Sequence, residues 1–236
     1  LEDQLSEDER QIRDAARDFA QNVLKPTVID RDNEQRFATE EINELGQLGF
    51  MGMMVDEKYG GSGMDTMSYV LAMEEISKVD ASVSVCMSVN NSLVCYGLQA
   101  YGTEEQKEKY LRPLASGQKI GAFCLSEPEA GSDATSQATT AIDCGDHYLL
   151  NGTKNWITNG GSASTYLVIA QTDPEKGHRG INALIVERAL EWNLASGANE
   201  LEEALDQRAE EHLLALVHEH MVSSQQRSRA FAFARR

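Results

Sequence analysis

Two polar segments in the middle of the chain carry residue types that could hold a flat heteroaromatic ligand. The first, Phe123 to Asp133, passes from an apolar stretch into a loop of Pro, Gly, Ser and Asp. Such a loop exposes backbone N–H groups and hydroxyls that can meet a polar ring or a phosphate. In the second, Asn155 to Gly160, alternation along a predicted strand puts Trp156 and Thr158 on one face. An indole beside a hydroxyl offers a stacking surface and one hydrogen bond.

Each segment also has a plainer structural interpretation. An ordinary surface turn accounts for Phe123 to Asp133, and a core Trp beside an exposed Thr accounts for the second segment. Composition and spacing alone do not decide between the two interpretations.

Two other groups of residues invite a functional interpretation that their spacing does not support. The loop from Gly60 to Gly63 follows no clear strand and lacks the G-x-G-x-x-G order of a dinucleotide site. His212, His218, Glu219 and His220 lack the i, i+4 pairing of a helical metal site, and a solvated helix face accounts for them. We therefore predict no metal site.

Charge and hydropathy exclude several classes of protein. The chain has 236 residues, 41% of them hydrophobic, which is enough to build a core. Its 38 acidic and 21 basic residues give a net charge of -17, which repels nucleic acid and anionic membrane surfaces. No apolar run approaches the about 20 residues that span a bilayer, and Leu1 to Gln4 is too acidic for a targeting sequence. We expect neither nucleic-acid binding nor membrane insertion.

The cysteines indicate a reducing compartment. Cys86, Cys95, Cys124 and Cys144 form no C-x-x-C pair, and a chain of this length needs no disulfides to fold. Small apolar side chains in a core account for all of them.

Residues 1–118 show helical periodicity and helix-start signals. Capping boxes begin at Ser6 and Thr103, each with Glu or Gln at the third position of the helix. Further helices are predicted from Thr39 and from Thr66, the latter with Val70, Met73 and Ile76 on one side. The stretch from Ser82 to Tyr101 alternates as a strand would, but its length favours a buried helix.

Residues 119–187 change to short apolar runs separated by turns, which predicts an antiparallel β region. The runs cover residues 120–125, 140–144, 148–150, 156–157, 166–170 and 181–186. Asn151-Gly152 is the strongest hairpin signal, and Gly145-Asp146 is a weaker one. The fold class is therefore α+β, with an N-terminal all-α domain and a partial antiparallel, barrel-like β domain.

Residues 188–236 form a tail of different composition, rich in Ala, Glu, Gln and Arg. An amphipathic helix is predicted from the spacing of Leu201, Leu205, Leu213, Leu216 and Val217.

Several motifs together resemble the acyl-CoA dehydrogenase family. The segments F-C-L-S-E-P-E-A-G-S-D, from Phe123, and L-N-G-T-K-N-W-I-T-N-G, from Leu150, are similar to the two signatures of that family in order and separation. Residues 72–77, 87–93 and 101–107 look like its short-chain, butyryl-CoA dehydrogenase branch. The resemblance covers Leu5 to about Glu187.

The resemblance implies an FAD site. By position, the residues that would meet the cofactor are Phe123, Leu125, Ser126, Gly131, Ser132, Trp156, Ile157 and Thr158. Trp156 would flank the flavin ring and Thr158 would hydrogen-bond near its N5 atom. Ser132 would lie where the flavin phosphate and the acyl-CoA substrate approach.

The resemblance also implies a reaction and partners. The family desaturates an acyl-CoA thioester in fatty acid oxidation, and its electrons pass to an electron-transfer flavoprotein. A homo-oligomer is expected, in the bacterial cytoplasm or else the mitochondrial matrix. Two alternatives stay open: an acyl-CoA oxidase of the same fold, and a non-catalytic remnant that binds acyl-CoA or protein.

The tail departs from the family pattern. After Glu187 the β domain of the family continues and then gives way to a helical bundle that carries the catalytic glutamate. Residues 188–236 are interpreted instead as a foreign or frame-shifted end after a truncation, and the chain alone is expected to be impaired or inactive. No catalytic residue is assigned, because the catalytic glutamate of the family is expected in the helical bundle that is missing here. Glu127 and Glu129 are not taken as substitutes, since they belong to a motif with another role.

Overall fold

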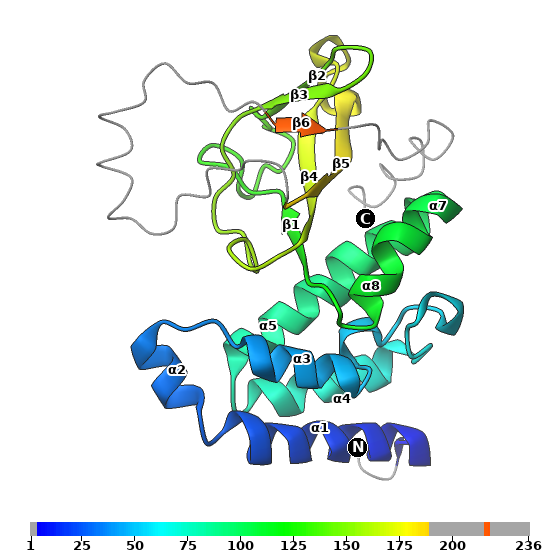
Figure 1. Ribbon diagram of the computed structural model, residues 1–236, viewed down its shortest axis with the longest axis vertical. Helices are drawn as coiled ribbons and strands as arrows, with labels where there is room; N and C mark the ends of the chain where they lie inside the picture. The colour runs from blue at the N-terminus through cyan, green and yellow to red at the C-terminus, as the bar shows by residue number, and fades with distance from the viewer. Residues whose placement is uncertain (1–3, 189–214, 218–236) are drawn as a thin grey trace. The chain divides into compact units, whose positions relative to one another are not determined.

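The chain divides into two compact units, Leu1–Ile120 and Gly121–Arg236. The computed structural model describes residues 4–188 and 215–217 (Figure 1). The α-helices are α1 Glu7–Phe19, α2 Val28–Glu34, α3 Thr39–Gln47, α4 Thr66–Ser77, α5 Ala81–Ser88, α6 Tyr96–Tyr101, α7 Glu104–Gln106 and α8 Arg112–Ala115. Short π-helical segments are η2 Ala20–Leu24, η5 Val89–Cys95 and η6 Lys107–Leu111, and 3₁₀ turns of the same unit are η3 Phe50–Gly52 and η4 Glu57–Tyr59.

The predicted helix starts are confirmed where a side chain satisfies a free backbone N–H group. Ser6 and Glu9 form a reciprocal capping box on α1, and Thr103 with Gln106 forms the same box on α7. Asp65 caps α4 by accepting a hydrogen bond from the Ser68 amide at 2.7 Å.

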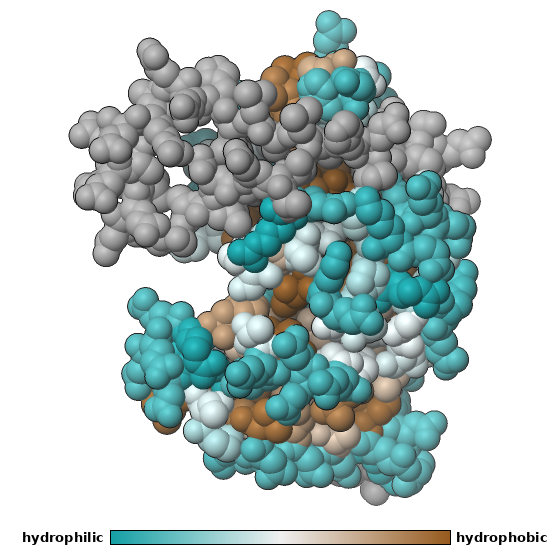
Figure 2. Space-filling view, in the orientation of Figure 1, coloured by the Kyte–Doolittle hydropathy of each residue, from teal (hydrophilic) through white to brown (hydrophobic). Residues whose placement is uncertain are grey.

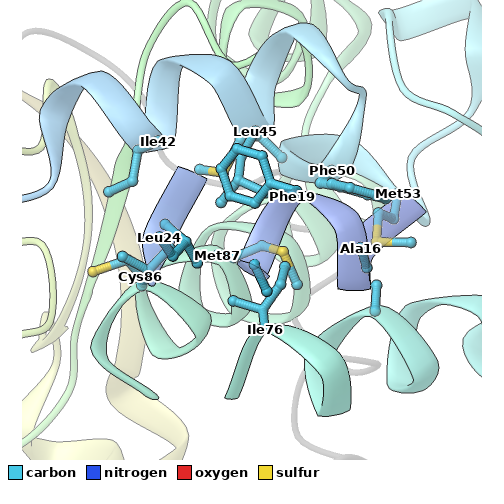
Figure 3. Packing of buried hydrophobic residues seen from close by; sticks show 14 of the residues in the cluster. Ala16, Phe19, Leu24, Ile42, Leu45, Phe50, Met53, Ile76, Cys86 and Met87 are labelled. Atoms are coloured by element: carbon cyan, nitrogen blue, oxygen red, sulfur yellow. The ribbon is translucent and has the colours of Figure 1, made fainter. Parts of the chain in front are cut away.

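The helical unit has one hydrophobic core, made of side chains from α1, α3, α4 and α5 with the turns beside them. Figure 3 shows Phe19 of α1, Leu45 of α3 and Met87 of α5 directed into the same space. In Figure 2 hydrophilic residues cover the outer side of α1, and hydrophobic residues lie along its inner side. This arrangement follows from the helical spacing of the apolar residues in α1.

Residues 82–101 are helical, as predicted, and run through α5, η5 and α6. The predicted apolar face of α4 is partly wrong. Ile76 is buried, but Val70 is 49% exposed, and α4 instead buries Tyr69 and Ala72. Apolar spacing on a helix rich in apolar residues does not say which of two possible faces the neighbouring helices cover.

A buried ionic cluster joins three segments of the helical unit. The Arg31 guanidinium pairs with Glu41 at 2.6 Å and with Asp80, and all three side chains are at most 7% exposed. Asp80 also accepts hydrogen bonds from the amides of Ser82 and Val83 at the start of α5, each at 3.0 Å. One side chain therefore both caps a helix and anchors a buried cation.

The second unit is built on a mixed sheet. Its strands are β1 Gly121–Cys124, β2 Thr140–Asp143, β3 Tyr148–Asn151, β4 Thr165–Gln171, β5 Ile181–Glu187 and β6 Ala215–Val217, and the segment η7, Pro174–Gly180, joins β4 to β5. The order is β1-β4-β2-β3-β6, with β5 also paired to β4. The predicted fold class is confirmed, but the sheet is not wholly antiparallel, because β1 and β2 both pair parallel to β4.

The pairing around β4 explains where the loop after β1 lies. β5 pairs with β4 over all seven residues and so occupies one edge of that strand. The other edge is left for β1, where Cys124 pairs with Val168, and for β2, where Thr140 pairs with Gln171. The chain from Leu125 to Thr139 therefore leaves this edge and returns to it three positions further along β4.

The predicted hairpin at Asn151-Gly152 is wrong, and the weaker signal marks the real turn. β2 and β3 are joined through Cys144 to His147, where Gly145 has φ 96° and the Cys144 amide bonds the His147 carbonyl at 2.9 Å. After Gly152 no strand forms, since residues 152–164 are irregular. The dipeptide has the right conformational freedom for a turn, but no second strand is available to close it.

One part of the predicted tail helix is also wrong. Leu216 and Val217 lie in β6, which pairs antiparallel with β3. Leu201, Leu205 and Leu213 lie outside the described residues.

Candidate functional site

The loop after β1 has a tight turn and an exposed tip. Glu127 and Ala130 exchange two backbone hydrogen bonds, at 3.1 and 3.2 Å, which close a turn around Pro128 and Glu129. Beyond the turn, residues 131–133 are exposed. The Asp133 carboxylate is bound within the loop, because it accepts hydrogen bonds from the hydroxyls of Thr135 and Ser136, each at 2.6 Å.

The second segment is an irregular loop and not the predicted strand. Trp156 has φ 59° and is 94% exposed, and a turn follows in which the Gly160 amide bonds the Ile157 carbonyl at 2.9 Å. The prediction that Trp156 and Thr158 share a strand face is therefore wrong, and so is the alternative of a core Trp. Period-two alternation has no meaning where the backbone is not extended.

The C-terminal end of this loop is held to neighbouring segments. Asn159, with φ 65°, donates from its side-chain amide to the carbonyl of Gly121, the first residue of β1, at 3.0 Å. The buried hydroxyl of Tyr166 lies 2.9 and 3.0 Å from the carbonyl oxygens of Gly160 and Ala163. Trp156 is thus presented to solvent from a loop that is fixed on β1 and β4.

One backbone hydrogen bond joins the two segments directly. The Asn155 amide donates to the Ser126 carbonyl at 2.9 Å. Beside it, the Lys154 ammonium donates to the Leu125 carbonyl at 3.1 Å. The strand-end residues Leu125 and Ser126 therefore lie next to the residues that precede Trp156.

A buried ion pair lies below this contact. The Lys154 ammonium is 2.5 Å from Glu127 Oε1, and it also donates to the side-chain oxygen of Gln137. The two charged side chains are 6% and 2% exposed. The same Glu127 carboxylate accepts the backbone amides of Ala138 at 2.6 Å and Thr139 at 3.2 Å. Both ends of the loop from Leu125 to Thr139 are therefore attached to one carboxylate.

The electrostatics of the pair favour an ionised Glu127. Burial by itself would raise the pKa of this carboxyl, but the Lys154 ammonium and the two amides outweigh it and hold the pKa below its ordinary value. Burial lowers the pKa of Lys154, against the attraction of Glu127. Glu127 is therefore a buried anion whose carboxylate oxygens are engaged by Lys154 and by the amides of Ala138 and Thr139.

The predicted cofactor residues fall into two groups. Phe123 in β1, and Leu125, Ser126, Ile157 and Thr158 in the loops, are half-buried, whereas Gly131, Ser132 and Trp156 are exposed. The structure brings Ser126 beside Asn155. Among the described residues no hydrogen bond joins Gly131 or Ser132 to the loop around Trp156.

Sequence reasoning missed the residues that hold the site together. Lys154, Gln137, Asn159 and Tyr166 were not predicted, since nothing in their sequence neighbourhood marks a lysine or glutamine as buried. The positive φ of Asn159 is the one feature with a local signal, because Asn followed by Gly favours turns.

Metal-binding groups and membrane-spanning helices can be looked for in the described part of the chain. Within residues 4–188 and 215–217 no group of His, Cys, Asp and Glu could hold a metal ion. His212, His218, Glu219 and His220 lie outside those residues. No helix in the described ranges is long and apolar enough to cross a bilayer.

Comparison with known proteins places the two units in one family of domains. Residues 6–118 match the family model "Acyl-CoA dehydrogenase, N-terminal domain", and residues 122–212 match "Acyl-CoA dehydrogenase, middle domain". The second match continues past Glu187, where the sequence interpretation ended the resemblance. That end point is corrected, and the first part of the tail is similar to the middle domain.

Individual relatives belong to the same family as the two domain matches. The short-chain specific acyl-CoA dehydrogenase of Clostridium acetobutylicum is 45% identical over 186 residues, which is 79% of this chain and 49% of that protein. The caffeyl-CoA reductase-Etf complex subunit CarC of Acetobacterium woodii is 45% identical over 197 residues, 83% of this chain and 52% of that protein. A glutaryl-CoA dehydrogenase of Mycobacterium smegmatis, solved in complex with FADH2, has a TM-score of 0.74 and 38% identity over 79% of this chain and 47% of its own. The chain spans about half the length of the curated relatives it matches.

Proposed function

The chain belongs to the acyl-CoA dehydrogenase family, and on this premise we propose that its protein catalyses the FAD-dependent α,β-dehydrogenation of a short-chain acyl-CoA thioester. The observation that carries the proposal is the hydrogen bond between Asn155 and Ser126, which joins both family signatures beside an exposed indole. The short-chain specific relative supports the choice of substrate.

The residues of the two loops fit a flavin chemically. The Trp156 indole is 94% exposed and offers a flat apolar surface for one face of an isoalloxazine ring. The hydroxyls of Ser126 and Thr158 can hydrogen-bond to the polar edge of that ring. At the tip, an added side-chain carbon on Gly131 would have no atom within 4 Å, so the backbone there is open to a phosphate.

The proposed reaction needs two transfers from adjacent carbons. The carbon next to the thioester would lose a proton to a carboxylate and the following carbon would lose a hydride, which leaves a C=C bond between them. FAD, when bound, would supply the hydride acceptor. Thr158 would orient the ring near N5, and Ser132 would meet the flavin phosphate and the acyl-CoA. We assign the base to none of the described residues.

Partners and setting are part of the same proposal. The relative from an Etf complex supports an electron-transfer flavoprotein as electron acceptor. We propose a homo-oligomer in the bacterial cytoplasm. The bacterial sources of the two relatives named above support a bacterial setting.

The test of cofactor binding is an absorbance spectrum of the purified chain after incubation with FAD and desalting. Retained flavin bands support the proposal. Trp156→Ala is the site variant, and Glu75→Gln in the helical unit is the matched control that should leave retention unchanged. A folded chain that binds butyryl-CoA but retains no flavin would contradict the proposal in favour of a non-catalytic binding protein.

The test of activity uses the whole protein. With the FAD-bound enzyme as catalyst, butyryl-CoA should be oxidised, and its electrons should reduce an artificial dye or an electron-transfer flavoprotein. Rapid oxygen consumption without an added acceptor would instead indicate an acyl-CoA oxidase.

A further inference from the structure

The buried cluster of Lys154, Glu127 and Gln137 has a geometry that a need for stability alone does not explain. Replacing a buried ion pair by well-packed apolar side chains is often neutral or stabilising, because desolvation offsets most of the attraction. Here the charged groups are 6% and 2% exposed. What the pair supplies beyond apolar packing is a fixed distance and direction between the segments that carry it.

Those segments are the ones that flank the proposed flavin contacts. The Lys154 ammonium reaches the Leu125 carbonyl, and the next residue, Asn155, donates its amide to the Ser126 carbonyl. Two successive residues of one loop are thus bonded to two successive residues of the other. Trp156 follows immediately, and Thr158 two residues later.

The Glu127 carboxylate binds the far end of the loop from Leu125 to Thr139. Glu127 holds the amides of Ala138 and Thr139, where the chain re-enters the sheet at β2. The base of the loop is therefore closed around Glu127 and Lys154, while Gly131 and Ser132 at its tip are exposed.

The backbone at Trp156 adds a second, independent observation. A non-glycine residue at φ 59° is strained, and such strain persists only where the neighbouring structure imposes it. On one side the imposed contacts are those of Lys154 and Asn155, and on the other side the contact of Asn159 with Gly121.

We propose that Lys154 is a positioning residue, whose ammonium, bound by Glu127 and Gln137, fixes the Ser126 loop against the Trp156–Thr158 loop and so sets the geometry of the flavin-facing surface. The flavin part of this inference rests on the proposed function. The fixing of the two loops does not, and it is measurable without any ligand.

The experiment uses the full chain with Trp192→Phe, so that Trp156 is the remaining tryptophan of the two in the sequence. Lys154→Met removes the ammonium and keeps an unbranched side chain that is one atom shorter. Hydrogen exchange at the Asn155 amide should become about tenfold faster or more, because the bond to Ser126 opens locally. Acrylamide should quench Trp156 fluorescence differently from the parent, and the Kd for FAD should rise about tenfold or more.

A neutral pair separates positioning from stability. Lys154→Met with Glu127→Gln leaves no buried charge unpaired, and the glutamine oxygen can still accept the amides of Ala138 and Thr139. This double variant should unfold at nearly the parent temperature and yet keep the fast Asn155 exchange and the weak FAD binding. If Lys154→Met alone does not fold, the double variant provides the same measurements.

The control is Glu75→Gln in the helical unit, which removes another buried carboxylate. It should lower the unfolding temperature without changing Asn155 exchange or the Kd for FAD. The inference is overturned if the neutral pair restores both Asn155 protection and parent FAD affinity. A parent chain that retains no FAD contradicts the proposed function, whereas slow Asn155 exchange in Lys154→Met contradicts the inference.

Discussion

The amide of Asn155 and the carbonyl of Ser126, 2.9 Å apart, join two segments that are far apart in the sequence. The contact forms because Leu125–Thr139 leaves the sheet at the edge of β4 and because the chain after β3 does not turn back as a hairpin. It places an exposed, strained Trp156 next to the end of β1.

Replacing Trp156 with Gly should separate stability from cofactor binding. Its side chain is 94% exposed and loses little packing, while glycine relieves the positive φ at the cost of a more flexible unfolded chain. We expect the free energy of unfolding to change by no more than about 1 kcal/mol, measured by urea titration. FAD retention should fall, and Trp156→Phe should keep more of it. A loss above about 2 kcal/mol would mean that the indole packs on the protein.

The stability of the helical unit should depend on pH through Glu75. Hydrogen bonds from Arg17 lead the effects that lower its pKa from 4.5 to about 2. A carboxyl with a lowered folded-state pKa contributes stability above its unfolded pKa and loses it as pH falls from 4.5 towards 2. Because Arg17 is 45% exposed and solvent screens it, we expect only about 1 kcal/mol.

The measurement is urea unfolding at about pH 7 and about pH 3. Glu75→Gln should be less stable than the parent at the higher pH and should lose less stability on acidification. Equal pH dependence in the two proteins would show that Glu75 does not titrate in this window.

Removing the Arg31 side chain should lower the free energy of unfolding strongly. Arg31→Leu leaves Glu41 and Asp80 as buried carboxylates without their cation, and this should cost about 3 to 5 kcal/mol near neutral pH. The penalty should shrink at acid pH, because burial disfavours the charged Asp80 carboxylate once Arg31 is gone, and its protonation removes that unpaired charge.

A compensated variant tests the reason for that cost. Glu41→Gln and Asp80→Asn, added to Arg31→Leu, should recover most of the stability, since asparagine can still cap α5 through the amides of Ser82 and Val83. Urea unfolding of the single and triple variants measures the recovered free energy of unfolding. A single variant that costs less than about 1 kcal/mol would show that the cluster is hydrated.

Gly52 should not accept a side chain. A carbon added there would lie 2.4 Å from the carbonyl oxygen of Ala115 and 2.7 Å from its Cα, and backbone atoms cannot rotate away. Gly52→Ala should destabilise the helical unit by about 1 to 3 kcal/mol in thermal unfolding. Gly131→Ala, with no atom within 4 Å, is the matched control and should stay within about 0.5 kcal/mol.

The sequence by itself determined the local elements and the family. Capping at Ser6 and Thr103, the long helix through residues 82–101 and the strand runs near β1, β4 and β5 depend on neighbours a few positions away, and they are confirmed. The two signatures likewise lie in continuous stretches, so the family was recognisable without coordinates.

Only the tertiary structure decided how those elements meet. Alternation predicts a strand but not its partner, so the parallel pairing of β1 and β2 with β4 was not predictable. The hairpin signal at Asn151-Gly152 failed because a turn forms only where a second strand can pair. The burial of Lys154 against Glu127 depends on contacts between distant segments, whose energies no local pattern of residues contains.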